Sequence, residues 1–156
     1  MSEHDPIRVV GYARVSTSEQ ATSGLGLAVQ ESAIRGECQR RGWQLVDFIR
    51  DEAESGKSLD RPGLRRALEL VADRKATVLV AAKLDRISRS VLDFAALLEW
   101  FTAADAALVA LDVGVDTSTP GGRLVANVFA SVAKWERDTI SARTRDALQA
   151  ARARGQ

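Results

Sequence analysis

The sequence has very little histidine and cysteine, the residues on which histidine-assisted catalysis and cysteine–histidine metal sites depend. It contains one histidine and one cysteine in 156 residues. Cys38 can form no internal disulfide and cannot hold a metal alone, which fits a reducing compartment, and His4 lies close to the N-terminus. A Ser-His-Asp arrangement and a cysteine–histidine metal site are therefore disfavoured. We expect a cytoplasmic protein that uses no metal.

Long apolar runs, strong net charge and common nucleotide-binding motifs are also missing. No apolar run reaches the roughly 18 to 20 residues needed to cross a bilayer, and the N-terminal MSEHDPIR lacks the order of a secretory signal. The formal net charge is +1, so bulk charge does not indicate a nucleic-acid partner. Because GxGxxG after the first strand and GxxxxGK[ST] are absent, we expect no nucleotide cofactor. Any anion site must come from local clustering.

The residues that are present predict one α/β core. The chain is 46% hydrophobic, enough to bury a single core at this length. Apolar runs that read as buried strands alternate with amphipathic stretches that read as helices, which favours a mostly parallel sheet with helices on both faces. Strands are expected at Ile7–Ala13, Leu45–Arg50, Thr77–Ala82 and Ala107–Asp112, and helices at Leu25–Arg41, Pro62–Arg74 and Val91–Ala104.

A long helix is predicted to follow this core. Thr119 can cap a helix that has Pro120 at its first position, and no strong breaker follows until Gly155. Such a helix would be roughly 50 Å long, whereas a compact chain of this size has a radius of gyration of about 15 Å. We therefore expect an α/β core in residues 1–118 and a projecting helix in residues 119–156.

The two halves of this helix differ in composition. Apolar residues keep helical spacing in the first half, and the second half is rich in arginine. One interpretation is a solvated helix end. The other, which we favour, is that the first half packs on a partner subunit and the second half follows a DNA backbone. The apolar positions are Leu124, Val125, Val128, Phe129, Val132 and Trp135, and the candidate DNA contacts are Arg137, Arg143, Arg145, Arg152 and Arg154.

Charged and hydroxyl side chains follow three of the predicted strands. Ligands of open α/β sheets bind beyond the carboxyl ends of the strands, so these residues are expected at one edge. Planar guanidinium groups donate paired hydrogen bonds to phosphate oxygens, which predicts a phosphate site. The alternative is an ordinary solvated edge. The residues are Arg14 and Ser16 after the first strand, Asp51, Ser55, Gly56 and Arg61 after the second, and Lys83, Asp85, Arg86, Ser88 and Arg89 after the third. If Ser16 is a nucleophile, these arginines must assist it electrostatically.

Four motifs occur in order along nearly the whole chain. They are Y-x-R-V-S-T with a following glutamine at Tyr12–Thr17 and Gln20, D-x-x-x-S-G with R-P-x-L from Asp51 to Leu64, K-L-D-R-[LI]-x-R at Lys83–Arg89, and E-R-x-x-I at Glu136–Ile140. Together they resemble the motifs of serine recombinases of the resolvase/invertase type.

This resemblance implies a site-specific DNA recombinase that works through a covalent intermediate. Ser16 would attack a DNA phosphate and form a 5′-phosphoseryl bond, with no nucleotide or metal required. The residues that would grip the phosphate are Arg14, Arg86 and Arg89, and the supporting residues are Arg61, Asp85 and Gln30. The resemblance also implies a homodimer joined through the long helix, a tetramer in the synaptic complex and double-stranded DNA as the substrate.

Three further expectations remain open at this point. Family members carry a DNA-recognition domain after the helix, and we expect it to be absent from this chain. A catalytically silent module that dimerises and only binds the DNA backbone would share the same fold. A signalling domain with a phospho-acceptor aspartate is disfavoured, because Arg14 and Ser16 stand where that chemistry needs a cluster of aspartates.

Overall fold

A five-stranded sheet forms the centre of the protein. The computed structural model describes residues 5–15, 25–52, 61–88 and 90–155. The strand order is β2-β1-β3-β4-β5, in which the first four strands run parallel and β5 runs antiparallel to β4. The strands are β1 (Arg8–Val15), β2 (Gln44–Glu52), β3 (Val78–Ala81), β4 (Ala107–Ala110) and β5 (Val115–Asp116). The predicted mostly parallel sheet is confirmed.

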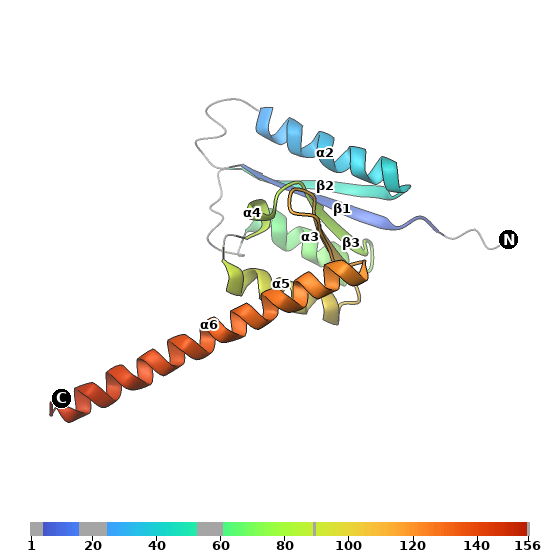
Figure 1. Ribbon diagram of the computed structural model, residues 1–156. Coiled ribbons are helices and arrows are strands. Elements are labelled where there is room, and N and C mark those ends of the chain that lie inside the picture. Colours follow the sequence, from blue (N-terminus) through green and yellow to red (C-terminus); the bar gives the residue numbers. More distant parts are fainter. Residues whose placement is uncertain (1–4, 16–24, 53–60, 89, 156) are drawn as a thin grey trace.

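Helices cover both faces of this sheet, as predicted (Figure 1). Helix α2 (Leu25–Arg41) lies on one face, and α3 (Pro62–Ala72), α4 (Leu84–Ile87) and α5 (Val91–Ala103) lie on the other. Successive strand residues point to opposite faces. Val9 of β1 therefore packs beneath α2, and Val10 packs with α3 and α5. Because both faces are buried, the central strands are nearly continuous runs of apolar residues.

The long helix α6 (Pro120–Ala153) has 34 residues and projects well beyond the core (Figure 1). The hydroxyl of Thr119 accepts a hydrogen bond from the backbone N–H of Gly122 at 3.0 Å, which is the predicted cap. Phe129 packs edge-on against Phe94 of α5, with ring centroids 5.0 Å apart. Within the described part of the chain, no helix is both long enough and apolar enough to cross a membrane.

Two short elements were not predicted, and one helix ends earlier than expected. Strand β5 has two residues and α4 has four, too few to show a hydrophobic period. The start of α4 is fixed from a distance, because the backbone N–H of Leu84 donates to Asp112 Oδ1 at 3.0 Å. Helix α3 was expected to reach Arg74 but stops at Ala72, and Arg74 has the positive φ of 61° that ends the helical path.

The first turn of α6 lies directly against β5. A Cβ atom on Gly122 would be 1.5 Å from the carbonyl oxygen of Asp116, which is backbone and cannot move aside cheaply. A Cβ atom on the neighbouring Gly121 would meet no atom within 4 Å. The absence of a side chain at Gly122 therefore allows α6 to begin where it does.

We predict that Gly122→Ala lowers the free energy of unfolding by about 1–3 kcal/mol, because the added methyl group forces the helix away from β5. The matched control is Gly121→Ala, which should be neutral or raise the free energy of unfolding by up to about 1 kcal/mol through helix propensity. Urea denaturation followed by tryptophan fluorescence measures both. Equal stabilities for the two variants would show that the close approach is unimportant.

Candidate functional site

The predicted site residues that the structure describes lie at or near the carboxyl ends of β1, β2 and β3, at one edge of the sheet. Strands β2, β1 and β3 are neighbours, and Arg14 of β1 is paired in register with Asp51 of β2. The segment after β3 forms α4, which carries Asp85 and Arg86. Ser16 and Arg89 lie outside the described residues, as do Ser55 and Gly56. The geometry of the site is therefore built from the residues around them.

Arg14 is 1% exposed, and its guanidinium group contacts the backbone of α4. Its Nη2 donates to the carbonyl oxygen of Asp85 at 2.9 Å, and its Nε donates to the carbonyl oxygen of Arg86 at 3.3 Å. These contacts join the end of β1 to the segment after β3.

Gln30 fixes the backbone of Arg14. Its Oε1 accepts from the backbone N–H of Arg14 at 3.3 Å, and its Nε2 donates to the carbonyl oxygen of Arg14 at 3.2 Å. Gln30 is 4% exposed and lies on α2. The amide side chain thus pairs with β1 in the manner of another strand, two residues before Ser16. The predicted nearness of Gln30 and Arg14 is observed.

Arg61 approaches the same α4 backbone from the start of α3. It is 1% exposed, and its Nη1 donates to the carbonyl oxygen of Arg86 at 2.7 Å, while its Nη2 donates to that of Ile87. Two buried arginines from different segments therefore hold three successive carbonyl groups of α4. This arrangement determines where the side chains of Asp85 and Arg86 stand.

Tyr12 and Asp51 complete this buried network. The sequence placed Asp51 at this sheet edge without a role, and it gave Tyr12 no place in the site. The Tyr12 hydroxyl donates to Asp51 Oδ2 at 2.7 Å and accepts from Arg61 Nη1 at 3.0 Å. Asp51 also accepts from the backbone N–H groups of Gly63 and Leu64 at 2.7 and 3.0 Å. Burial, followed by the hydrogen bond to Asp51, raises the pKa of Tyr12 far above its usual value, so the hydroxyl keeps its proton.

The carboxylate of Asp51 also starts helix α3. Arg61, the residue before the helix, makes no side-chain capping bond, so Asp51 supplies the acceptor from β2 instead. Negative charge at a helix N-terminus is favourable. A Cβ atom on Gly63 would lie 2.7 Å from Asp51 Oδ1, so only glycine lets the carboxylate approach this closely. Tyr12 and Asp51 fall inside two of the sequence motifs, which was the signal available for finding them.

Asp85 lies at the exposed side of this cluster, and the largely buried Arg86 lies beside it. Arg86 Nε lies 3.6 Å from Asp85 Oδ1, and their side chains are 12% and 56% exposed. With Arg14 and Arg61 beneath them, the described cluster holds three guanidinium groups and two carboxylates, those of Asp51 and Asp85. Such an arrangement can bind an anion at its open side and hold it with little movement.

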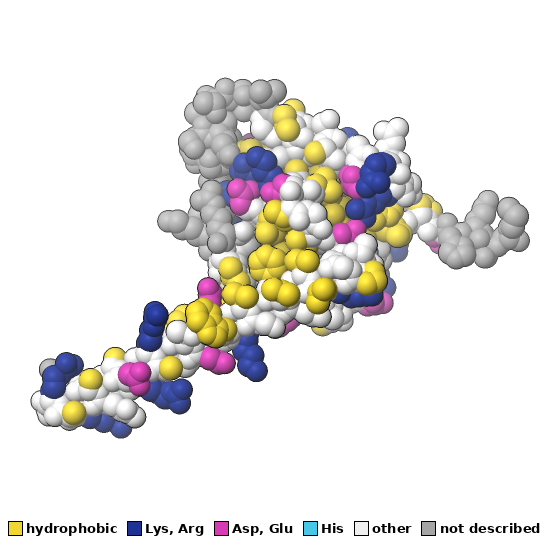
Figure 2. Space-filling model, viewed as in Figure 1, with side chains coloured by type: hydrophobic (Ala, Val, Ile, Leu, Met, Phe, Trp, Pro, Cys, Tyr) yellow, Lys and Arg dark blue, Asp and Glu magenta, His cyan; other side chains and the backbone are white. Residues whose placement is uncertain are grey.

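The candidate DNA-binding arginines lie far from this cluster along α6. Arg137, Arg143, Arg145, Arg152 and Arg154 are all exposed. Figure 2 shows basic side chains along the projecting half of the helix, interspersed with acidic ones. The structure therefore separates a compact arginine cluster at the sheet edge from an extended series of basic residues on the helix.

The sequence is similar to those of known DNA-rearranging proteins. A protein-family model described as "Resolvase, N terminal domain" matches residues 9–156. A DNA-invertase of Escherichia phage P1 is 38% identical over 147 residues, which cover 94% of this chain and 72% of the invertase. The transposon Tn917 resolvase of Enterococcus faecalis is 37% identical over 147 residues, with the same two coverages of 94% and 72%.

Solved structures show the same likeness in three dimensions. The N-terminal catalytic domain of TP901-1 integrase superposes with a TM-score of 0.78 at 31% identity, covering 85% of this chain and 98% of that domain. A resolvase family site-specific recombinase from Streptococcus pneumoniae superposes with a TM-score of 0.74 at 28% identity, covering 94% of this chain and 99% of that one.

The buried network predicts the effect of removing one hydroxyl group. Tyr12→Phe should lower the free energy of unfolding by about 1–3 kcal/mol, because Asp51 and Arg61 each lose a hydrogen-bond partner that water cannot replace. A double-mutant cycle with Asp51→Asn, measured by urea denaturation, should show non-additive losses. Additive losses would mean that the two residues act independently.

The same variant has a characteristic dependence on pH. The pKa of Tyr12 is raised in the folded protein, so folding binds a proton that the unfolded chain loses above its ordinary value of 10.0. The stabilisation by Tyr12 is thus complete below pH 10 and declines as the pH rises further. Tyr12 is the sole tyrosine, so the stability difference between wild type and Tyr12→Phe isolates this effect. A difference that stays constant at alkaline pH would contradict the assignment.

Proposed function

The chain belongs to the resolvase family of serine recombinases, and from this membership we propose that it breaks and rejoins DNA strands through Ser16. Recombinases of this family act on DNA at specific sites. The observation that carries the proposal is the convergence of Arg14, Arg61 and Gln30 from three separate segments on one sheet edge. Arg14 itself precedes Ser16 by two positions.

In the proposed reaction Ser16 is the nucleophile. Its hydroxyl gives up its proton, and its oxygen bonds to the phosphorus of a DNA phosphodiester. The bond from phosphorus to the 3′ oxygen breaks, and that oxygen takes up a proton and leaves as a 3′ hydroxyl. The 5′ end stays joined to the serine as a phosphate ester. Attack by a 3′ hydroxyl on this ester reverses the sequence and rejoins DNA, so no nucleotide is consumed.

The arginines take the place of a histidine in this proposal. Negative charge builds up on the phosphate oxygens in the transition state, and fixed guanidinium groups stabilise it there. We assign the contacts with the phosphate to Arg14, Arg86 and Arg89. Arg61, Asp85 and Gln30 support them, and the contacts of Arg61 with the carbonyl oxygens of Arg86 and Ile87 agree with a supporting role.

We further propose that α6 serves both the dimer and the DNA. In its first half, the side chains of Leu124, Val128 and Trp135 are 65%, 55% and 66% exposed, an arrangement that a second copy of the helix would cover. The exposed arginines in its second half, from Arg137 to Arg154, would follow the DNA backbone. Double-stranded DNA cut on both strands requires two active sites, so we assign a homodimer that pairs into a tetramer. In this scheme residues 1–118 are the catalytic core and residues 119–156 are the dimer and DNA helix.

The decisive test looks for DNA attached to Ser16. The chain is joined through α6 to a DNA-binding domain of known specificity, incubated with DNA carrying paired sites, digested and examined by mass spectrometry. We expect a nucleotide adduct on Ser16, no adduct in Ser16→Ala, and an unchanged yield in the matched control Ser18→Ala. Tight binding without an adduct, across several core sequences, would favour the catalytically silent module.

The role of the α6 arginines predicts a change in salt dependence. Each phosphate contact contributes about 0.9 to the slope of log affinity against log salt concentration. Replacing both Arg143 and Arg145 by alanine should therefore reduce the slope by about 1.8 in magnitude. Arg66→Ala, which removes a 69% exposed arginine from α3, is the control and should leave the slope unchanged. Equal slopes for all three proteins would refute DNA contact by these two residues.

A further inference from the structure

An ion pair joins the C-terminal end of α2, the end farther from Gln30, to strand β5. Arg41, the last residue of α2, donates from Nη1 to Asp116 Oδ2 of β5 at 2.5 Å. The two residues are 75 positions apart in the sequence, and neither falls in any of the four motifs. Asp116 is 8% exposed, so the pair is largely shielded from water. Interactions between shielded charges are weakened less by solvent and salt than those on the surface.

Both partners are held in place by further contacts. Arg41 donates from Nε to Glu37 Oε1 at 2.6 Å and stacks over the ring of Trp43, 4.4 Å from its centroid. Asp116 Oδ1 accepts from the backbone N–H and the hydroxyl of Ser118 at 2.9 and 2.5 Å. Burial alone would raise the pKa of Asp116, but the hydrogen bonds from Ser118 and Arg41 outweigh it and lower the pKa, so the carboxylate stays charged at neutral pH.

The backbone of Asp116 also contacts the residues that begin α6. Its carbonyl oxygen accepts from the backbone N–H of Thr119 at 3.2 Å and from the Thr119 hydroxyl at 2.9 Å. The same oxygen lies against Gly122. The side chain of Asp116 therefore contacts α2, while its backbone contacts the first turn of α6. Through this one residue the end of α2 is tied to the beginning of the long helix.

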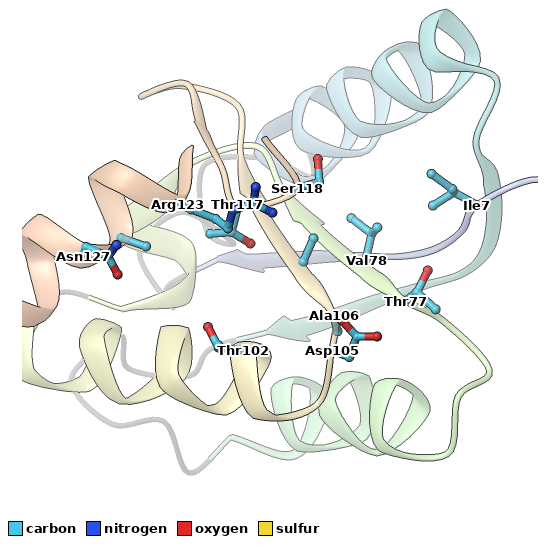
Figure 3. Close-up of a pocket in the computed structure, with 12 residues that line it drawn as sticks. Ile7, Thr77, Val78, Thr102, Asp105, Ala106, Thr117, Ser118, Arg123 and Asn127 are labelled. Atoms are coloured by element: carbon cyan, nitrogen blue, oxygen red, sulfur yellow. The ribbon is translucent and has the colours of Figure 1, made fainter. Parts of the chain in front are cut away.

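One side of the first turns of α6 faces a hollow of about 480 Å³, which lies between these turns and the segment that joins α5 to β4. Figure 3 shows the residues that line it. Arg123 and Asn127 line it from α6, and Thr102, Asp105 and Ala106 line it from the other side. The direction of α6 therefore depends on the contacts at Asp116 together with the packing of α6 along α5, where Phe129 meets Phe94 and Ala126 also reaches the core.

The other end of α2 reaches the candidate site. Gln30, in the second turn of α2, holds the backbone of Arg14 with two hydrogen bonds. Helix α2 has 17 residues and runs lengthwise over β1 and β2 (Figure 1). Helix α2 thus connects the end of β1, just before Ser16, with the residues that precede α6.

We propose that Arg41 is a positioning residue for recombination: its ion pair with Asp116 sets the direction in which α6 leaves the core, and so places the DNA-contacting half of α6 relative to Ser16. The proposal rests on the proposed function, because it assumes that DNA held by α6 is cut at Ser16. Arg41 acts through Asp116 and touches no part of the DNA.

The test measures the direction of α6 in the intact 156-residue chain. Spin labels are attached to cysteines placed at the exposed positions Glu69 on α3 and Ser141 on α6, in a Cys38→Ala background diluted with unlabelled protein. Pulsed electron paramagnetic resonance gives the distance distribution between them. We expect Arg41→Gln to shift or broaden this distribution. The control is Arg35→Gln, which removes a pair with Glu31 on the surface of the same helix and should change nothing.

A charge reversal separates a specific pair from general damage. Arg41→Asp combined with Asp116→Arg should return the distance distribution toward that of the wild type, whereas each single reversal should not. If Arg41→Gln fails to fold, Asp116→Asn is read in the same way, since it keeps the shape of the side chain and removes its charge. A wild-type distribution in Arg41→Gln, or in Asp116→Asn where that variant is used, would overturn the proposal.

The adduct assay on Ser16 then tests the link to the reaction. With α6 misdirected, the adduct yield of Arg41→Gln should fall by up to about 100-fold, the cost of an ångström-scale misplacement, while Arg35→Gln keeps the wild-type yield. An undiminished yield in Arg41→Gln would overturn the positioning role. Absence of the adduct from the wild type would instead contradict the proposed function, and the distance measurement would still decide whether the ion pair directs α6.

Discussion

Two arginine side chains lie almost fully inside the protein, and their guanidinium groups donate to the carbonyl oxygens of Asp85, Arg86 and Ile87. Moving a charged group out of water is costly unless it is paired and hydrogen-bonded. Here the compensation comes from backbone carbonyl dipoles and from the network of Tyr12 and Asp51. The position of the short helix α4 is therefore fixed by both arginines at once, and the rest of the sheet edge is arranged around it.

This constraint joins three parts of the chain that are far apart in sequence. Arg14 comes from β1, Arg61 from the start of α3 and the carbonyl groups from α4, while Gln30 adds α2. Anions bound at such an edge meet charges that are already held in place, so little reorganisation is needed when charge builds up on them. Much of the buried polar structure near the proposed nucleophile thus serves to hold other polar groups in position.

The sequence was sufficient for the elements whose signals are local. The apolar runs predicted β1 to β4, and the Thr119 cap with Pro120 predicted the start of α6. It was also sufficient for bringing Arg14, Asp51 and Arg61 to one sheet edge, because parallel strands place their carboxyl ends together. The sequence could not show that the described contacts of Arg61 are all with groups inside the protein. Arg61 donates to backbone carbonyl oxygens, and the direction of those oxygens is set by the tertiary structure.

Contacts between distant residues also explain the elements that were missed. The start of α4 depends on Asp112, which lies 28 positions away, and β5 is recognisable only once β4 is beside it. The Arg41–Asp116 pair has no local pattern at all. These features have a common physical cause. Each depends on a polar contact between residues that are separated in the sequence, and nothing in the sequence near either residue indicates its partner. Helix α2 contacts Arg14 through Gln30 and Asp116 through Arg41, and on the proposal above these contacts let the end of α2 influence a reaction whose chemical groups it does not touch.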